Sequence, residues 1–277
     1  MIPFNFSYHK PESIKEAAEI FQTLDSQGKQ PLYYGGGTEI ISMARTNNIH
    51  TSAVIDIKSI PECNVFGIQN DDLIIGAAVT LSQISESNLF PLLGKSGGRV
   101  ADHTIQCKIT LGGNIGGTII YREAVLPLLL SDSQLVIAGI DGIKQLPISD
   151  LFNERLRLGK GEFLLQAVTK IEYTSLPYVH VKKTKQDKID YPLITITALK
   201  KEDRVRVAFS GLCSYPFRSL IMEEDLNSTN IPLESRISNA ISHIPGPIVS
   251  DTLGSADYRK FVLSKMLSNT LNKMGAV

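Results

Sequence analysis

Two glycine clusters constrain the fold of this chain more than any other feature of its sequence. Residues 33–40 read YYGGGTEI and residues 108–117 read KITLGGNIGG, so each cluster stands beside a β-branched or aromatic run and contains a threonine. Glycine loses more backbone entropy on folding than other residues, so its clusters are kept where φ must be positive or where another group approaches the main chain closely. The two clusters therefore form either two separate turns or two walls of one pocket.

A functional interpretation of the clusters is anion binding. Consecutive backbone N–H groups in a turn, or at the N-terminus of a helix, form a concave donor site for phosphate. Thr38 and Thr110 could add hydroxyl donors, and Asn114 an amide. GGGTEI is not GxGxxG, and no GKS or GKT follows either cluster, so Rossmann and P-loop motifs are both excluded. Two interpretations remain: the two glycine turns hold a diphosphate between them, or each turn is purely structural.

The first 175 residues alternate between helical and strand-like segments. The stretch PESIKEAAEIFQTL predicts a helix, because Ser13 and Glu16 form a capping-box pattern and apolar residues recur at helical spacing. KQPLYYGGGTEIISMART predicts a short strand, a glycine turn and the start of a helix. AVIDIKSI is strand-like, DLIIGAAVTLSQI predicts a strand that runs into a serine-led helix, and AVLPLLLSDSQLVIAG predicts a short helix and then a strand. Around ADHTIQCKITLGGNIG a strand-like stretch meets the second glycine turn.

The character of the sequence changes after about residue 170. Apolar and polar residues alternate, with Val205, Val207 and Phe209 on one side, which is typical of antiparallel strands. The tail is amphipathic, and its predicted helical stripe consists of Phe261, Val262, Met266, Leu267, Leu271 and Met274. We therefore predict a boundary near residue 175, with one domain over 1–175 and a second over 176–277.

Composition excludes several classes of protein. Lys plus Arg and Asp plus Glu both number 28, and the resulting zero net charge argues against a nucleic-acid binder. No apolar run approaches the ~18 residues of a membrane span, and the N-terminus lacks the layout of a signal peptide. The three cysteines form no CxxC pair and the five histidines show no metal spacing, so we assign no metal ligand and no catalytic residue. A reduced, cytoplasmic setting is the simplest expectation.

The order and separation of YYGGGTEI and TLGGNIGG resemble the flavoprotein (medium) subunit of molybdenum hydroxylases, the family of xanthine dehydrogenase and carbon monoxide dehydrogenase. YHKPESIKEAAEIF, AVIDIKSIPE, LIIGAAVTLSQI and YRKFVLSKML resemble further family segments, so the resemblance covers almost the whole chain. It implies an α+β fold: an FAD-binding PCMH-type domain, similar to vanillyl-alcohol oxidase and built of two α/β parts, followed by a smaller C-terminal domain of antiparallel sheet and helices.

The same resemblance implies which residues bind FAD. The first turn would lie along the diphosphate through Tyr33, Tyr34, Gly35, Gly36, Gly37, Thr38, Glu39 and Ile40. The second turn would hold its other side through Thr110, Gly112, Gly113 and Asn114, with Leu111 near the isoalloxazine ring. Ordinary core packing is the alternative for Tyr33, Tyr34, Ile40 and Leu111.

Three further positions are implied farther along the chain. Glu123 stands where the family usually has an aspartate that contacts the adenosine ribose, and the longer side chain leaves its geometry open. Leu164 and Lys182 align with positions that touch the isoalloxazine region in the xanthine dehydrogenase branch. A cation there would stabilise the reduced flavin anion. A solvated lysine is the alternative for Lys182.

The family's function requires partners. A molybdopterin-binding large subunit hydroxylates the substrate, and electrons pass through two [2Fe–2S] clusters of a small subunit to FAD and then to NAD+. The resemblance is nearest to bacterial xanthine dehydrogenases, which favours a purine. Flavin subunits of carbon monoxide dehydrogenase or of N-heterocycle hydroxylases, a stand-alone FAD oxidase and a cofactor-free assembly subunit are the alternatives.

Overall fold

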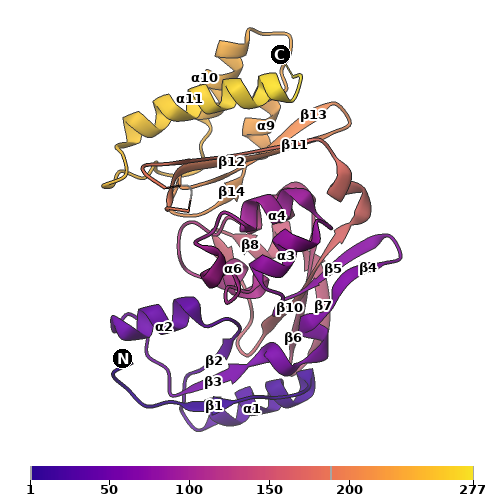
Figure 1. The fold of residues 1–277 in the computed structure, drawn as a ribbon, viewed down its shortest axis with the longest axis vertical. Helices are drawn as coiled ribbons and strands as arrows, with labels where there is room; N and C mark the ends of the chain where they lie inside the picture. Colours follow the sequence, from indigo (N-terminus) through magenta and orange to yellow (C-terminus); the bar gives the residue numbers. More distant parts are fainter. Residues whose placement is uncertain (1, 188, 277) are drawn as a thin grey trace.

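The computed structural model describes residues 2–187 and 189–276 and stacks three sheet-based layers (Figure 1). The first layer is a parallel sheet in the order β1-β3-β2. Its strands are β1 (Ser7–His9), β2 (Pro31–Tyr34) and β3 (Ala53–Asp56). Helix α1 (Ile14–Ser26) lies on one side of these strands and α2 (Thr38–Arg45) on the other.

The second layer is a five-stranded antiparallel sheet in the order β4-β5-β10-β6-β7. Its strands are β4 (Phe66–Gln69), β5 (Asp72–Gly76), β6 (Gln134–Gly139), β7 (Gly142–Pro147) and β10 (Phe163–Lys170). The helices around it are α3 (Leu81–Ser87), α4 (Pro91–Gly97), α5 (His103–Gln106), α6 (Leu111–Gly116), α7 (Val125–Leu130) and α8 (Ile148–Leu151). The shorter elements are η1 (Ile57–Ser59), η2 (Pro61–Asn64), β8 (Phe152–Asn153), β9 (Arg155–Leu156) and η3 (Ile171–Ser175).

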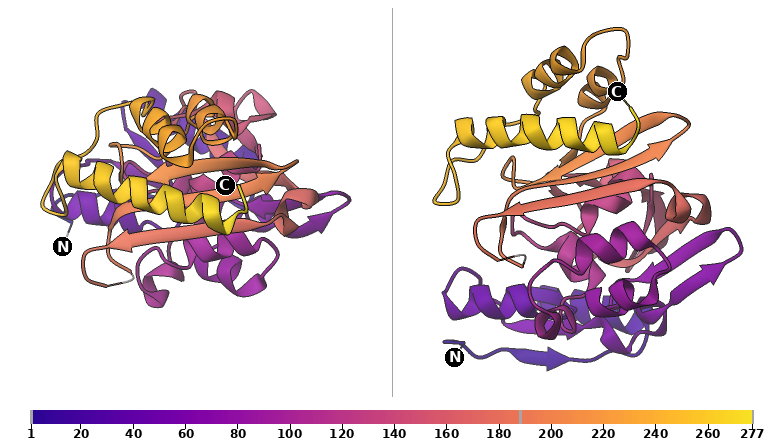
Figure 2. Two further views of the ribbon diagram at one scale, coloured as in Figure 1. Left: turned by 90° about the horizontal axis from the view of Figure 1, so that it is seen from above. Right: turned by 45° about the horizontal axis from the view of Figure 1, so that its top comes forward.

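The third layer is an antiparallel sheet in the order β11-β12-β13-β14. Its strands are β11 (Tyr178–Thr184), β12 (Pro192–Lys201), β13 (Arg204–Ser210) and β14 (Phe217–Arg218), and its helices are α9 (Leu220–Leu226), α10 (Leu233–Ser242) and α11 (Ala256–Lys273). Figure 2 shows α11 lying across the outer face of this sheet, while its inner face contacts α4 and α7 of the second layer. A separate apolar core therefore forms between the sheet and its helices. The boundary near residue 175 stays a prediction.

Several local predictions are confirmed. Ser13 accepts a hydrogen bond from the Glu16 N–H and starts α1, although the Glu16 carboxylate returns to the Glu12 N–H rather than to the cap residue. The strand, glycine turn and helix predicted around the first cluster are β2, residues 35–37 and α2. Val205, Val207 and Phe209 are all fully buried in the C-terminal core.

Three predictions are wrong. The strand-like stretch before the second glycine cluster is helical, because Asp102 caps α5 and Thr110 caps α6; only an isolated bridge between Thr80 and Thr110 is strand-like. Thr80, not a serine, caps α3. Phe261 is 61% exposed, whereas the rest of the predicted stripe, on α11 and at its C-terminal cap Met274, is buried. Within residues 2–187 and 189–276, no helix is long and apolar enough to cross a membrane.

Candidate diphosphate site between two glycine turns

The first glycine turn joins the carboxyl end of a parallel strand to the N-terminus of a helix. Strand β2 ends at Tyr34, and Gly37 precedes α2 in a left-handed conformation with φ of 70°. A Cβ at Gly37 would lie 2.1 Å from the Tyr34 ring, so both the backbone conformation and the space require glycine. This edge of a parallel sheet is where α/β proteins commonly bind phosphates.

Within the part of the chain that the structure describes, the backbone amides of the first turn have no acceptor. The six N–H groups from Gly35 through Ile40 donate to no acceptor among residues 2–187 and 189–276, and no side chain within that range caps α2. A run of unpaired N–H groups at a helix N-terminus carries a partial positive charge and attracts an anion. The first turn therefore fits a phosphate or diphosphate.

A cation stands beside these amides. The Lys58 ammonium donates to the Gly35 carbonyl at 2.8 Å and to the Asp56 carboxylate at 2.6 Å, and it lies 4.6 Å from the centre of the Tyr34 ring. No sequence pattern singled out Lys58. It follows β3, whose carboxyl end shares an edge with that of β2, so the position of parallel strand ends could have identified it.

The structure brings the two glycine clusters together. A Cβ at Gly35 would lie 2.6 Å from Thr110 Oγ1, and one at Gly36 would lie 1.6 Å from the Lys108 carbonyl oxygen. Only glycine permits this approach. The two clusters therefore lie directly against each other, as two walls of one site would require.

The second turn differs from the first in its hydrogen bonding. The Leu111 N–H donates to Val79 O at 2.8 Å and the Gly112 N–H to Ala77 O at 2.9 Å. The N–H groups of Gly113 and Asn114 donate to Thr110, through its Oγ1 at 3.1 Å and its carbonyl at 2.9 Å, and Asn114 Oδ1 accepts from Ala124 at 3.2 Å. What the second turn offers a ligand is a surface without side chains, because Gly113 and Gly116 are exposed.

Most of the predicted apolar site residues belong to the core. Leu111 and Leu164 are buried in the core of the second layer. The Tyr33 ring stacks on Phe21 at 5.3 Å, its hydroxyl donates to Gly161 O at 2.9 Å, and burial raises the pKa of that hydroxyl. Tyr34 and Ile40 line an apolar hollow beneath α2.

Glu123 and Lys182 form a buried ion pair. The Lys182 ammonium lies 2.9 Å from Glu123 Oε2, with 1% and 2% of the two side chains exposed. The ammonium also donates to Arg99 O at 2.7 Å, and the Thr195 hydroxyl donates to Glu123 Oε1 at 2.5 Å. Burial raises the pKa of Glu123, against the opposing charge of Lys182. The pair joins the second layer to the C-terminal sheet, and the ammonium and both carboxylate oxygens already have hydrogen-bond partners within the protein.

An aromatic pair lies in the segment after the second turn. Tyr121 stacks on Tyr191 with ring centres 4.7 Å apart and planes 20° apart, and Tyr191 is 57% exposed. The pair joins the chain after α6 to the connection between β11 and β12. It offers a flat apolar surface on which a planar ring could stack.

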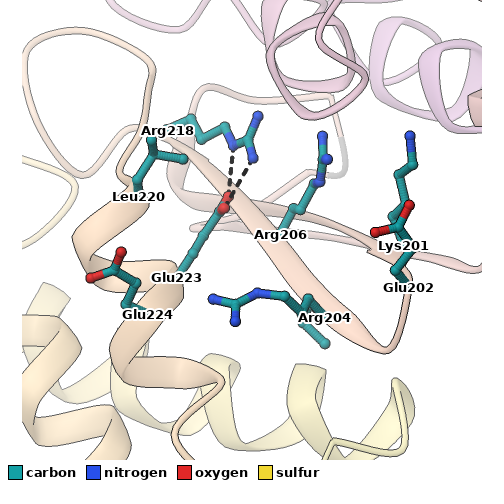
Figure 3. A pocket seen from close by; sticks show the side chains of 9 residues that line it. Lys201, Glu202, Arg204, Arg206, Arg218, Leu220, Glu223 and Glu224 are labelled. Carbon is teal, nitrogen blue, oxygen red and sulfur yellow. Dashed lines mark hydrogen bonds and ion pairs between the residues drawn. The ribbon is translucent and has the colours of Figure 1, made fainter.

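A charged hollow on the C-terminal sheet is a different kind of feature. Figure 3 shows the Arg218 guanidinium paired with Glu223, with N–O distances of 2.7 and 3.0 Å. Arg206 and Arg218 also contact Asp132, at 2.5 and 2.7 Å. The two pairs with Asp132 fix the C-terminal sheet to the connection before β6, so we interpret the cluster as structural.

Comparison with known proteins identifies the family. Residues 4–168 match the family described as FAD binding domain in molybdopterin dehydrogenase. The carbon monoxide dehydrogenase medium chain of Hydrogenophaga pseudoflava is 26% identical over 156 residues, which are 55% of this chain and 53% of that protein, so the chain spans about half the length of this relative. The nicotine 6-hydroxylase medium subunit of Paenarthrobacter nicotinovorans is 22% identical over 278 residues, or 97% of each chain.

The likeness to a solved structure confirms the predicted fold class. Carbon monoxide dehydrogenase from Hydrogenophaga pseudoflava superimposes with a TM-score of 0.88 over 100% of this chain and 99% of that chain, at 21% identity. The free amides of the first turn fit the diphosphate of a dinucleotide. The family model matches residues 4–168, which are more than half of the chain. The chain therefore belongs to the family of FAD-binding domains of molybdopterin dehydrogenases, and its cofactor is FAD.

Proposed function

We propose that the FAD diphosphate lies against the amides of the first glycine turn. The observation that carries this proposal is the run of six N–H groups, Gly35 through Ile40, that have no acceptor among the described residues. Lys58 lies beside the turn, where its charge offsets that of the Asp56 carboxylate, and the glycine surface at Gly113 lets the cofactor approach the second turn closely. In this proposal the second turn is mainly a wall rather than a donor.

An aromatic pair that the sequence did not single out is the proposed contact of the isoalloxazine ring. Tyr121 and Tyr191 offer a flat apolar surface of the kind on which such a ring stacks. Glu123 and Lys182 are left out of the proposed cofactor contacts, because each already binds the other inside the protein. Leu111 and Leu164 act through the core that supports the site.

We propose that the chain is the flavin-binding medium subunit of a heteromeric molybdenum hydroxylase. Bound FAD supplies a group that accepts single electrons and releases a pair. The expected partners are a molybdopterin-binding large subunit and a [2Fe–2S] small subunit, with NAD+ as acceptor. Xanthine is one candidate substrate, on the sequence resemblance alone. The full-length match to a nicotine 6-hydroxylase medium subunit favours the wider class of N-heterocycles.

Purification of a tagged copy with its untagged neighbours tests this function. We expect a yellow protein that releases FAD on denaturation, co-purifies with the two partners and shows no substrate oxidation by itself. A colourless chain that takes up no added FAD would instead support the cofactor-free assembly subunit. Substrate turnover by the isolated chain would support the stand-alone oxidase.

A further inference from the structure

Helix α2, which carries the free amides, is loosely packed. Ala44 is the one residue of α2 that is fully buried. Beneath the helix lies an apolar hollow of about 210 Å³, lined by Ile40, Ile41 and Ala44 on the helix and by Phe4 and Phe6 of the N-terminal arm. Protein interiors are normally close-packed, so a helix above a hollow is held less firmly than a core helix. Another contact must fix the position of its amides.

Glu39, in the first turn of α2, makes that contact. Its Oε1 accepts hydrogen bonds from both the N–H and the hydroxyl of Thr118, each at 2.6 Å. Thr118 follows α6 and the second glycine cluster, so this interaction joins the two walls of the site across 79 residues of sequence. The Thr118 hydroxyl also lies 3.6 Å from Met43 Sδ, one helical turn farther along α2. Hydrogen bonds to a charged acceptor are among the stronger ones in proteins.

Gly117 makes room for the carboxylate. Its φ of −62° is open to any residue, so backbone conformation does not require glycine there. A Cβ at this position would lie 2.5 Å from Glu39 Oε2 and 3.1 Å from the Gly113 carbonyl oxygen. The last glycine of the second cluster is therefore explained by the packing of Glu39.

We propose that Glu39 is a latch that fixes α2 against the second turn and so holds the amide cradle at the spacing a diphosphate needs. Glu39 is then a positioning residue rather than a cofactor ligand, since a carboxylate in contact with a diphosphate would repel it. Without the Glu39–Thr118 hydrogen bonds, α2 shifts over the hollow, and its N–H groups no longer point at one common position. The inference rests on the proposed FAD site.

The test measures FAD affinity of the full-length chain after removal of its cofactor. Glu39→Ala removes the acceptor, and we expect FAD binding to weaken by about 10-fold or more, because FAD then binds only the minor fraction of molecules in which α2 is in place. Glu39→Gln keeps an oxygen that Thr118 can reach, and we expect it to stay within about 3-fold of wild type. Gly117→Ala displaces the carboxylate from the other side and should weaken binding in the same direction.

Two controls separate the latch from general destabilisation. Glu19→Ala removes an exposed glutamate from α1, and we expect no change in FAD affinity. In the double variant Glu39→Ala/Thr118→Val, the second substitution should add no further loss, because its hydrogen-bond partner is already gone. The thermal midpoint of the cofactor-free Glu39→Ala protein should fall by only about 2–4 °C for each kcal/mol lost with the hydrogen bonds, whereas its FAD affinity falls by about 10-fold or more.

The outcomes are distinguishable. Glu39→Ala protein that binds FAD as tightly as wild type would overturn the latch, and so would a Glu39→Gln variant as weak as Glu39→Ala. Should the alanine variant not fold, the glutamine and Gly117→Ala variants decide the question by the same comparison. Wild-type protein that binds no FAD would overturn the proposed function itself.

Discussion

Replacing Lys182 with alanine tests the buried ion pair that joins the second layer to the C-terminal sheet. The substitution leaves the Glu123 carboxylate, 2% exposed, without its charged partner. Removing one member of a buried pair costs about 3–5 kcal/mol, because an uncompensated charge remains inside the protein. For a chain of this size we expect the thermal midpoint to fall by roughly 10 °C.

The loss should depend on pH in a definite direction. Burial already raises the pKa of Glu123, and the pKa rises further once the lysine is absent. A carboxyl whose folded-state pKa exceeds its unfolded value stabilises the fold below the unfolded pKa and loses that contribution as pH rises through the folded pKa. The deficit of Lys182→Ala should therefore shrink as pH falls from 8 towards about 4.3, the usual pKa of glutamate.

Chemical unfolding of the full-length chain, followed by circular dichroism, measures both effects. Lys183→Ala is the matched control, because its side chain is the exposed neighbour on β11. The double variant Glu123→Leu/Lys182→Met should recover much of the loss, since it replaces both charges with apolar groups. A Lys182→Ala protein within about 1 kcal/mol of wild type, or one whose deficit is flat with pH, would refute the reasoning, because breaking a buried pair costs several-fold more.

Two further predictions concern a buried histidine and the contact between the turns. Burial lowers the pKa of His180 from 6.5 to about 3. Between these pH values the imidazole is protonated in the unfolded chain but not in the folded chain, so the free energy of unfolding falls as pH drops from 6.5 towards 3. The loss of unfolding free energy amounts to up to about 5 kcal/mol. His180→Asn should remove this pH dependence from a series of unfolding curves, and an unchanged slope of unfolding free energy against pH would argue against the buried, neutral histidine. Gly36→Ala places a Cβ 1.6 Å from the Lys108 carbonyl oxygen and should weaken FAD binding by about 100-fold or more, as measured by titration, because the turns must separate. Gly67→Ala, where a Cβ meets nothing within 4 Å, should bind normally, and equal affinity for both variants would contradict the contact.

Local sequence patterns predicted several elements of the fold, including those on either side of the first glycine turn. Ser13 starts α1 and the first glycine cluster joins β2 to α2, because these features depend on hydrogen bonds and backbone angles within a few residues. The alternation of Val205 and Val207 predicted a strand for the same reason. The strand-like stretch before the second cluster was misjudged because a short apolar segment fits either a strand or a helix until caps such as Asp102 decide.

Contacts between distant residues could not be read from the sequence. Family resemblance suggested that the glycine clusters share a ligand, but not that Gly36 lies against Lys108. It also gave no sign that the amides of the second turn already donate to Val79 and Ala77. Nor does any local pattern relate Glu123 to a lysine 59 residues away on β11, or predict that both partners of the pair are buried.

Nuclear magnetic resonance of protein labelled with ¹⁵N only at glycine tests the central claim most directly. We predict that FAD shifts the amide signals of Gly35, Gly36 and Gly37 and slows their hydrogen exchange, because their N–H groups gain phosphate acceptors. The amides of Gly112 and Gly113 already have protein acceptors and should keep their exchange rates. Riboflavin, which has the ring but no diphosphate, should leave the hydrogen-exchange rates of all five glycine amides unchanged. Tight FAD binding with no change at Gly35, Gly36 and Gly37 would contradict the account.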